Sequence, residues 1–282
     1  MKKTTSTTAQ DGGTTRVAVL GTGKMGGILL QGFLERKLVP AANLAATARH
    51  DDRARSLGRQ FPIAVGTDNL AAVHRADVVL ICVKPQAMRE VLEEIRPALA
   101  AGKLLISIAA SVPIASIEKL AGAGVPVVRA MPNMPCQVGC GMTALARGKH
   151  ASDAHLAMAR RLFEAVGKTI VLDEKHMDAV TGLSASGPAF VYVILESLAE
   201  AGVKVGLPRE VATLLAAQTA LGAAQVVLET GAHPALLKDA VTTPAGCTID
   251  GLLELEDGRL RVTLIKAVVK AVQRARELWF EP

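Results

Sequence analysis

Threonine hydroxyls surround a tight turn that leads into an apolar stretch between residues 241 and 256. Thr242 and Thr243 precede the turn Pro-Ala-Gly at 244–246, and Thr248 follows it. We expect a helix to begin there, with unpaired backbone N–H groups and the positive end of its dipole beside these hydroxyls. Such donors suit a small carboxylate, although threonine and proline before a helix are more often ordinary caps.

A second chemical motif lies near the start of the chain, where Val17–Leu20 is followed by Gly-Thr-Gly-Lys-Met-Gly. An apolar strand, a glycine-rich turn and a helix in that order bind the pyrophosphate of a dinucleotide. Gly21 permits the tight turn, Gly23 lets the backbone approach the phosphates, and Gly26 allows close helix packing. A purely structural glycine turn is the alternative, and the position of the motif in a βαβ array argues against it.

The residue after the second predicted strand indicates which dinucleotide binds. NAD enzymes place Asp or Glu there, on the ribose 2′-hydroxyl. Here the position holds Arg49, and the first carboxylate is Asp51. A guanidinium suits a 2′-phosphate, which predicts NADPH as the preferred cofactor and NADH as a second one. An exposed arginine that caps a helix is the alternative role.

Two further strand ends face the crevice where sheets of this kind bind ligands. One is Cys82-Val83-Lys84-Pro85 and the other is Ser107-Ile108-Ala109-Ala110-Ser111. Their small residues and the turn at Pro85 let the backbone lie against the nicotinamide half of the cofactor. Lys84 either contacts a phosphate or ribose or is a solvated loop residue.

These motifs lie on an alternation of β-rich and helical stretches that ends near Asp173. The β-rich runs are 16–20, 44–48, 77–83, 104–108, 125–130, 141–146 and 169–172. Strands separated by helices predict parallel βαβ units and a doubly wound sheet. After Asp173 come four helical runs separated by glycines, at 188–201, 208–229, 248–256 and 259–279.

The fold class predicted is α/β, with an N-terminal Rossmann-type doubly wound sheet followed by an all-α C-terminal dimerisation domain. We expect a disordered tail over 1–15, a dinucleotide-binding domain over 16–175, and a helical dimerisation and substrate-binding domain over 176–282. In the tail, Lys2 and Lys3 are followed by no apolar run, so neither a signal peptide nor an anchor is expected. A cytoplasmic location follows.

Composition limits the partners. Half of the 282 residues are apolar, which predicts a folded globular protein. The net charge of +6 suggests a nucleic-acid partner. However, the basic residues are scattered, and the chain has only one Tyr and one Trp that could stack on bases. We therefore expect no nucleic-acid partner, and instead a cationic protein that handles phosphates and carboxylates.

The segment 211–228 carries no charge and is long enough for a membrane span to be considered. Its content is Ala, Gly, Gln and Thr more than Leu or Ile, which favours a helix buried on all sides of a protein over a membrane helix. A small helical domain cannot cover such a helix alone, so a homo-oligomer is expected.

Four cysteines, at 82, 136, 140 and 247, set the expected redox state. The pair Cys136-xxx-Cys140 lacks a second Cys or His pair at zinc spacing, so no metal site is expected. Buried thiols in a reducing compartment are the favoured interpretation.

Taken in order, these motifs resemble those of pyrroline-5-carboxylate reductase, the enzyme of the last step of proline synthesis. The resemblance runs from about residue 16 to residue 278. It covers Gly21-x-Gly-x-Met, Val83-Lys84-Pro85, Met131-Pro-Asn-Met-Pro135, residues 178–190, Leu237-Lys-Asp239 and residues 242–256. The family implies that NADPH gives a hydride from its C4 to the imine carbon of 1-pyrroline-5-carboxylate, which yields L-proline.

The resemblance also implies roles for residues. Backbone amides around Gly246 and Cys247, together with Thr243, would hold the substrate carboxylate, and the catalytic Thr248 hydroxyl would donate to the imine nitrogen. A threonine hydroxyl is too weak an acid to be an independent proton source, so Thr248 is expected to orient the substrate. Ser184 to Gly187 either close the site or cap a helix. The cofactor residues expected from motifs and resemblance are Gly21, Gly23, Lys24, Met25, Arg49, Val83, Lys84, Pro85, Ala109, Ala110 and Asn133.

This chain departs from the family pattern at three positions near the expected site. Ala245 stands where a second glycine is usual, Ala185 replaces a common Gly, and Phe190 stands where Tyr is frequent. Each change adds a methyl group or removes a hydroxyl. The departures bear on substrate affinity and leave the reaction class unchanged.

Two other functions compete with this one. A β-hydroxyacid dehydrogenase or related imine reductase shares the glycine-rich domain followed by helices. Hydroxyacid dehydrogenases of this type need a catalytic Lys near the start of the helical half, and residues 181–197 contain none. A regulatory protein that binds NADPH without turnover explains the glycine turn and Arg49. It gives no reason for the threonine-rich carboxylate site.

Overall fold

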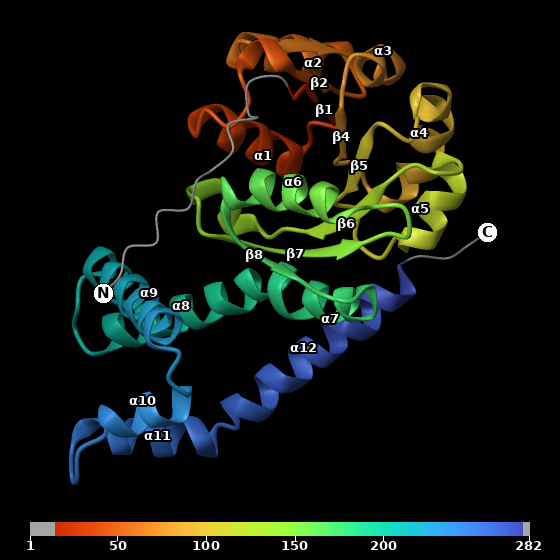
Figure 1. The fold of residues 1–282 in the computed structure, drawn as a ribbon. Helices are drawn as coiled ribbons and strands as arrows, with labels where there is room; N and C mark the ends of the chain where they lie inside the picture. Colours follow the sequence, from red (N-terminus) through yellow and green to blue (C-terminus); the bar gives the residue numbers. More distant parts are fainter. Residues whose placement is uncertain (1–14, 279–282) are drawn as a thin grey trace, which may run out of the picture. The chain divides into compact units, whose positions relative to one another are not determined.

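The computed structural model describes residues 15–278 (Figure 1). Apart from Thr15, the predicted disordered tail lies outside the described residues, as does Trp279 at the end of the last predicted helix. The described chain forms two compact units, one of residues 15–185 with 272–278 and one of residues 186–271. The domain boundary predicted at residue 175 stays a prediction.

The first unit contains one eight-stranded sheet in the order β3-β2-β1-β4-β5-β6-β7-β8. Strand β1 lies between β2 and β4, and the chain winds outward from it in both directions, which confirms the doubly wound fold. The central strands are short apolar runs buried along their whole length, as parallel strands covered on both faces must be. The strands are β1 Val17–Leu20, β2 Leu44–Thr47, β3 Ala64–Gly66, β4 Val78–Ile81, β5 Leu104–Ser107, β6 Val127–Met131, β7 Gly141–Arg147 and β8 Gly167–Val171.

Two features of the sheet differ from the sequence prediction. Strand β7 pairs antiparallel with β6, so the expectation of parallel units throughout is wrong at this point. The connection spans only residues 132–140, and a parallel crossover needs a dozen residues or more. Strand β3 was not predicted, because its three residues, Ala-Val-Gly, are too few to form a pattern.

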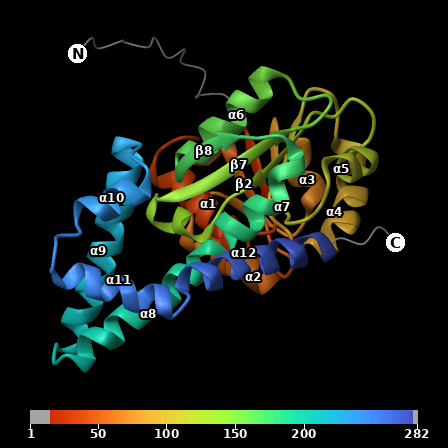
Figure 2. The ribbon, with the colours of Figure 1, turned by 90° about the horizontal axis from the view of Figure 1, so that it is seen from below.

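Helices cover both faces of the sheet and form two apolar cores (Figure 2). Alternate residues of β1 enter the two cores, with Val17 and Val19 on one face and Ala18 and Leu20 on the other. The helices of this unit are α1 Lys24–Glu35, α2 Asp51–Gln60, α3 Asn69–His74, α4 Met88–Ile95, α5 Ile114–Ala121, α6 Asp153–Glu164 and α7 Met177–Val180. Shorter turns are the 3-10 helices η1 Ala41–Asn43, η2 Pro85–Ala87, η3 Arg96–Ala98, η4 Met134–Val138 and η5 Glu174–His176, and the π-helix η6 Thr181–Ala185.

The second unit is helical, as predicted. Its helices are α8 Gly187–Lys204, α9 Arg209–Thr230, α10 Pro234–Ala240, α11 Cys247–Asp257 and the first part of α12 Leu260–Glu277. The sequence did not predict α10, which is seven residues long. Helices α8 and α9 pack side by side, and Gly202 makes room for Ala212 at their contact.

Helix α9 is not buried on all sides within the single chain, as expected of a helix that a small domain cannot cover alone, and its burial by a second copy stays a prediction. Only Ala212 and Ala216 of α9 are buried, whereas Leu214, Leu221 and Leu228 are 69%, 56% and 64% exposed. Two helical segments, 174–204 and 209–230, are long and apolar enough to cross a membrane by length and composition alone.

Candidate functional site

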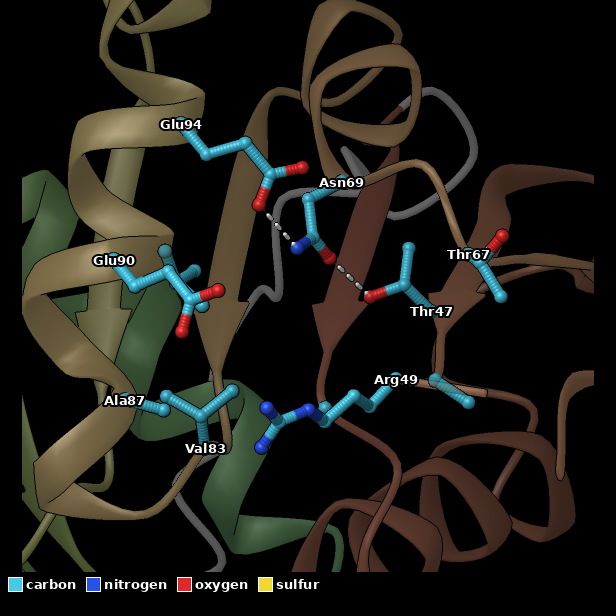
Figure 3. A pocket seen from close by; sticks show the side chains of 11 residues that line it. Thr47, Arg49, Thr67, Asn69, Val83, Ala87, Glu90 and Glu94 are labelled. Atoms are coloured by element: carbon cyan, nitrogen blue, oxygen red, sulfur yellow. Dashed lines mark hydrogen bonds between the residues drawn. The ribbon is translucent and has the colours of Figure 1, made fainter. Parts of the chain in front are cut away.

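A cavity of about 230 Å³ opens at the carboxyl ends of the central strands (Figure 3). It lies where the chain winds outward from β1 to β2 on one side and to β4 on the other, which is the place where open α/β sheets bind ligands. The residues that line it are Gly21, Thr47, Ala48, Arg49, Thr67, Asn69, Val83, Ala87, Glu90, Val91 and Glu94.

The glycine-rich turn forms one wall of this cavity. Gly21 has φ +85°, and a Cβ there would lie 2.6 Å from the Val83 side chain. A Cβ at Gly26 would lie 2.6 Å from the Gly21 carbonyl oxygen, so neither position has room for a side chain. In the described part of the chain, no atom beyond the neighbours of Gly23 lies within 4 Å of its Cβ position, and no side chain caps the N-terminus of α1. The turn thus leaves open space beside uncapped amides, which suits an anion.

Thr22, which sequence analysis passed over, anchors this turn to β2. Its hydroxyl and its backbone N–H both donate to the Thr47 carbonyl oxygen at 2.9 Å, and the Gly21 N–H donates to the same oxygen at 3.2 Å. Thr22 is only 2% exposed. The position of Thr22 between the two glycines of the turn is the sequence feature that could have indicated this anchoring role.

Arg49 extends from the end of β2 across the cavity, with its guanidinium toward Val83 (Figure 3). Its side chain has no hydrogen bond or ion pair within the described part of the chain. Helix α2 begins at Asp51 with His50 as N-cap, and no side chain caps it. The alternative role of helix cap is therefore not observed for Arg49.

A hydrogen-bonded chain crosses the opposite wall of the cavity. The Thr47 hydroxyl donates to the Asn69 side-chain oxygen at 2.6 Å, and the Asn69 amide donates to Glu94 Oε2 at 2.8 Å (Figure 3). Sequence analysis missed Asn69, Glu90 and Glu94. Asn69 follows the unpredicted strand β3, and the two glutamates lie on α4 with no motif around them.

The other predicted cofactor residues lie outside the cavity lining. Lys84 is exposed as the N-cap of η2, Pro85 is the first residue of η2, and Lys24 and Met25 lie in the first turn of α1. Ala109 is buried and Ala110 half-buried after β5. The neighbouring Ser111 is buried with φ +66°, and its hydroxyl has no hydrogen-bond partner among residues 15–278. The roles of these residues in cofactor binding stay predictions.

Asn133 joins the end of β6 to the π-helix. Its amide donates to the Ser184 carbonyl oxygen at 3.2 Å, and its side-chain oxygen accepts from the Met142 N–H at 2.8 Å. The side chain is therefore held in place by polar contacts on two sides. Ala185 follows Ser184 and packs against one apolar core.

Arg129 of β6 is a buried cation in the same region. It pairs with Glu174 at 3.1 Å and lies 3.8 Å from Asp178. The Glu174 carboxylate also accepts from the Ile114 N–H at 2.6 Å, so it links η5 to the start of α5. Together these contacts fix the segment that leads into the π-helix.

The threonine-rich segment of the second unit enters α11 through a strained turn. Gly246 is the N-cap of α11 without a side-chain cap, and its N–H donates to the Thr243 carbonyl oxygen at 3.1 Å. Ala245 has φ +54°, a left-handed conformation that favours glycine. The Thr242 hydroxyl donates to the Lys238 carbonyl oxygen at 2.7 Å.

The predicted substrate residues in this segment are accessible. Thr243, Cys247 and Thr248 are exposed and Gly246 is half-buried in the single chain. No side chain among residues 15–278 caps α11, so its first amides lie beside these hydroxyls, and their role in holding a carboxylate stays a prediction.

The four cysteines are free thiols, but they do not share one environment. Burial raises the pKa of Cys82 and of Cys136, so both thiols are neutral at pH 7. Cys140 and Cys247 are exposed, so the expectation of buried thiols is wrong for these two in the single chain.

Comparison with known proteins identifies the family. A family model described as pyrroline-5-carboxylate reductase dimerisation matches residues 174–278, and one described as NADP oxidoreductase, coenzyme F420-dependent, matches residues 16–111. A pyrroline-5-carboxylate reductase of Methanosarcina acetivorans is 41% identical over 263 residues, which cover 93% of this chain and 97% of the relative. The chain belongs to the pyrroline-5-carboxylate reductase family.

Solved structures of the pyrroline-5-carboxylate reductase family agree with this fold over both units. The Coxiella burnetii member superposes with a TM-score of 0.88 at 34% identity, and the match covers 95% of this chain and 100% of the Coxiella chain. The Plasmodium falciparum pyrroline carboxylate reductase, solved with NADP bound, has a TM-score of 0.85 at 30% identity, covering 94% of this chain and 98% of that one. The resemblance and the fold class predicted from sequence are both confirmed, and the helical C-terminal region is the family's dimerisation domain.

Proposed function

We propose that this chain is an NADPH-dependent pyrroline-5-carboxylate reductase, which transfers a hydride to the imine carbon of 1-pyrroline-5-carboxylate to give L-proline, the last step of proline biosynthesis. The observation that carries the proposal is family membership over nearly the whole chain, with a relative 41% identical across 93% of it. NADPH supplies the hydride when bound.

The residues of the first unit fit this cofactor. The open space at Gly23 and the uncapped start of α1 receive a pyrophosphate, and the free guanidinium of Arg49 pairs with a 2′-phosphate. Lys24, Lys84 and Asn133 belong to the same proposed site. The work of this unit is to bind and orient the cofactor, because the hydride chemistry belongs to the cofactor itself.

The residues of α11 and its preceding turn take the substrate. The amides from Gly246 to Thr248, with the Thr243 hydroxyl, hold the ring carboxylate. The Thr248 hydroxyl donates a hydrogen bond to the ring nitrogen and orients the imine. The proton that the nitrogen gains comes from water, because a threonine hydroxyl is too weak an acid to supply it.

The proposed assembly and location are supported by the same family membership. We propose a homo-oligomer formed through the C-terminal helices, because the exposed apolar residues of α8 and α9 lie within the family's dimerisation domain. A second copy of the chain, and not lipid, then covers these two helices. The proposed location is the cytoplasm, with no nucleic-acid partner.

The decisive experiment measures NADPH oxidation and L-proline formation by the purified protein supplied with 1-pyrroline-5-carboxylate. We expect both to proceed in equal amounts. NADPH binding without turnover would favour the regulatory alternative. Oxidation of a β-hydroxyacid with no reduction of the imine would favour the dehydrogenase.

A further inference from the structure

The cavity beside the glycine-rich turn has an apolar side and an acidic side. Val83 and Ala87 lie together just before α4, and Val91 within α4 also lines the cavity (Figure 3). Glu90 and Glu94 lie on the same helix, and the Glu90 carboxylate faces the cavity. Two carboxylates four residues apart on one helix face repel each other, so their placement costs the helix stability.

The two carboxylates differ in their partners. Glu94 accepts a hydrogen bond from the Asn69 amide at 2.8 Å, and Asn69 is itself held by Thr47. Glu90 has no hydrogen bond or ion pair within residues 15–278. Glu93, on the outside of α4, approaches Arg89 at 3.8 Å and does not line the cavity. Glu90 is therefore the carboxylate in this wall whose two oxygens both lack a partner among the described residues, and both are available to a ligand.

The chemistry of the wall indicates which part of the cofactor it meets. A carboxylate repels a phosphate, so Glu90 does not suit the 2′-phosphate assigned to Arg49. A purine ring offers a flat apolar face to Val83, Ala87 and Val91. The 6-amino group of adenine donates to a carboxylate, whereas a 6-oxo group presents an acceptor and is repelled.

We infer that Glu90 accepts a hydrogen bond from the 6-amino group of the cofactor's adenine and so selects adenine over 6-oxo purines. This inference rests on the proposed function, in that the cofactor is an adenine dinucleotide. Glu90 is an exposed residue in the single chain, so the selection is moderate and does not approach that of a buried site.

The test compares kcat/KM for NADPH and for its counterpart with hypoxanthine in place of adenine. We expect the unaltered enzyme to prefer NADPH about tenfold or more, as a charge-assisted hydrogen bond predicts. In Glu90→Gln the preference should fall to about threefold or less, because the new amide can donate to the 6-oxo group. Glu93→Gln is the matched control on the same helix, and it should keep the original preference.

Three results would overturn the inference. One is equal use of the two cofactors by the unaltered enzyme. The second is a Glu90→Gln variant whose kcat/KM falls by the same factor for both cofactors. The third is a Glu90→Gln variant in which the ratio of kcat/KM for NADPH to kcat/KM for NADH changes while the preference for the 6-amino over the 6-oxo cofactor stays the same. This result would assign Glu90 to the ribose. If the imine is not reduced at all, the proposed function fails, and fluorescence titration of the two reduced cofactors still tests Glu90.

Discussion

At the scale of single residues, the site depends on side chains left without partners inside the chain. Arg49 and Glu90 both face the cavity, carry opposite charges, and form no ion pair with any described residue. Exposed charges of this kind are solvated and contribute little to the stability of the fold, so they remain available to a ligand. In the proposed site their different chemistry suits different parts of one dinucleotide.

Arg49→Ala should raise the KM for NADPH about tenfold or more while sparing NADH, since the lost guanidinium made charge-assisted bonds only to the 2′-phosphate. Steady-state kinetics with both cofactors checks this. Arg55→Ala, on the exposed side of α2 where Arg55 pairs with Asp52, is the control and should change neither KM. Equal losses with NADPH and NADH would show that Arg49 is structural.

Thr248→Val should lower kcat/KM for the imine by about 10- to 150-fold, because the hydrogen bond to the ring nitrogen is lost while shape and β-branching are kept. NADPH affinity, measured by fluorescence titration, should barely move. The same substitution at Thr213, an exposed threonine of α9, should leave both values unchanged. Full activity in a folded Thr248→Val protein would leave the amides of the turn as the substrate donors.

At the scale of elements, segments of distinctive composition could be predicted from sequence and the others could not. Strand β1 is a wholly apolar run directly before a glycine-rich turn, and helix α9 contains 18 residues without a charge. Strand β3 and helix α10 have three and seven residues, too few for a period to show. Because β3 was not predicted, Asn69, which follows it in the polar wall of the cavity, was not predicted as a site residue.

The direction of β7 cannot be predicted from its own residues, because a strand's apolar pattern does not depend on the direction in which it runs. The connection of residues 132–140 indicates an antiparallel strand, because it is too short to contain a crossover helix. The candidate site was predicted as far as its glycines, Arg49 and Val83. These residues belong to a local motif, whereas Glu90 and Glu94 come together with them only through the sheet order.

The starts of β1 and β4 are joined by an ion pair whose contribution should depend on pH. Arg16 donates to Asp77 at 2.7 Å, and this side-chain hydrogen bond is the main reason why the pKa of Asp77 is lowered. The contribution to stability is therefore complete above the unfolded-state pKa of about 3.9 and is lost as the pH falls through the lower folded-state pKa.

Urea unfolding of the native protein and of Asp77→Asn, compared from neutral pH to strong acid, checks this dependence. We expect the native protein to be slightly more stable at neutral pH and the difference to vanish in strong acid. High salt should weaken the difference at neutral pH, since both side chains are exposed. A difference that is constant over the whole pH range would show that the carboxylate charge is not involved.

At the scale of the whole molecule, α9 presents a stripe of exposed leucines at intervals of seven residues. Leu214, Leu221 and Leu228 lie on one helix face, and each is more than half exposed in the single chain. A stripe of this size is typical of a helix that packs against another helix. It is the surface that the proposed homo-oligomer would bury.

Leu214→Glu should weaken self-association about 100-fold or more, because a carboxylate would be buried without a partner at the interface. Sedimentation velocity at low micromolar concentration should show the native protein as a dimer or larger and the variant as a monomer of 29.4 kDa. Val138→Glu is the control, since Val138 has the same 69% exposure but lies in the first unit. A native protein that sediments as a monomer would contradict the proposed assembly.

The return of α12 to the first unit also determines the order in which that unit can be completed in the cell. Residues 272–278 belong to the first unit, and Ala275 among them is 2% exposed. The ribosome makes residues 186–271 before it reaches them, which takes several seconds at about 5–20 residues per second. The first unit therefore lacks residues 272–278 until the entire helical unit has been translated.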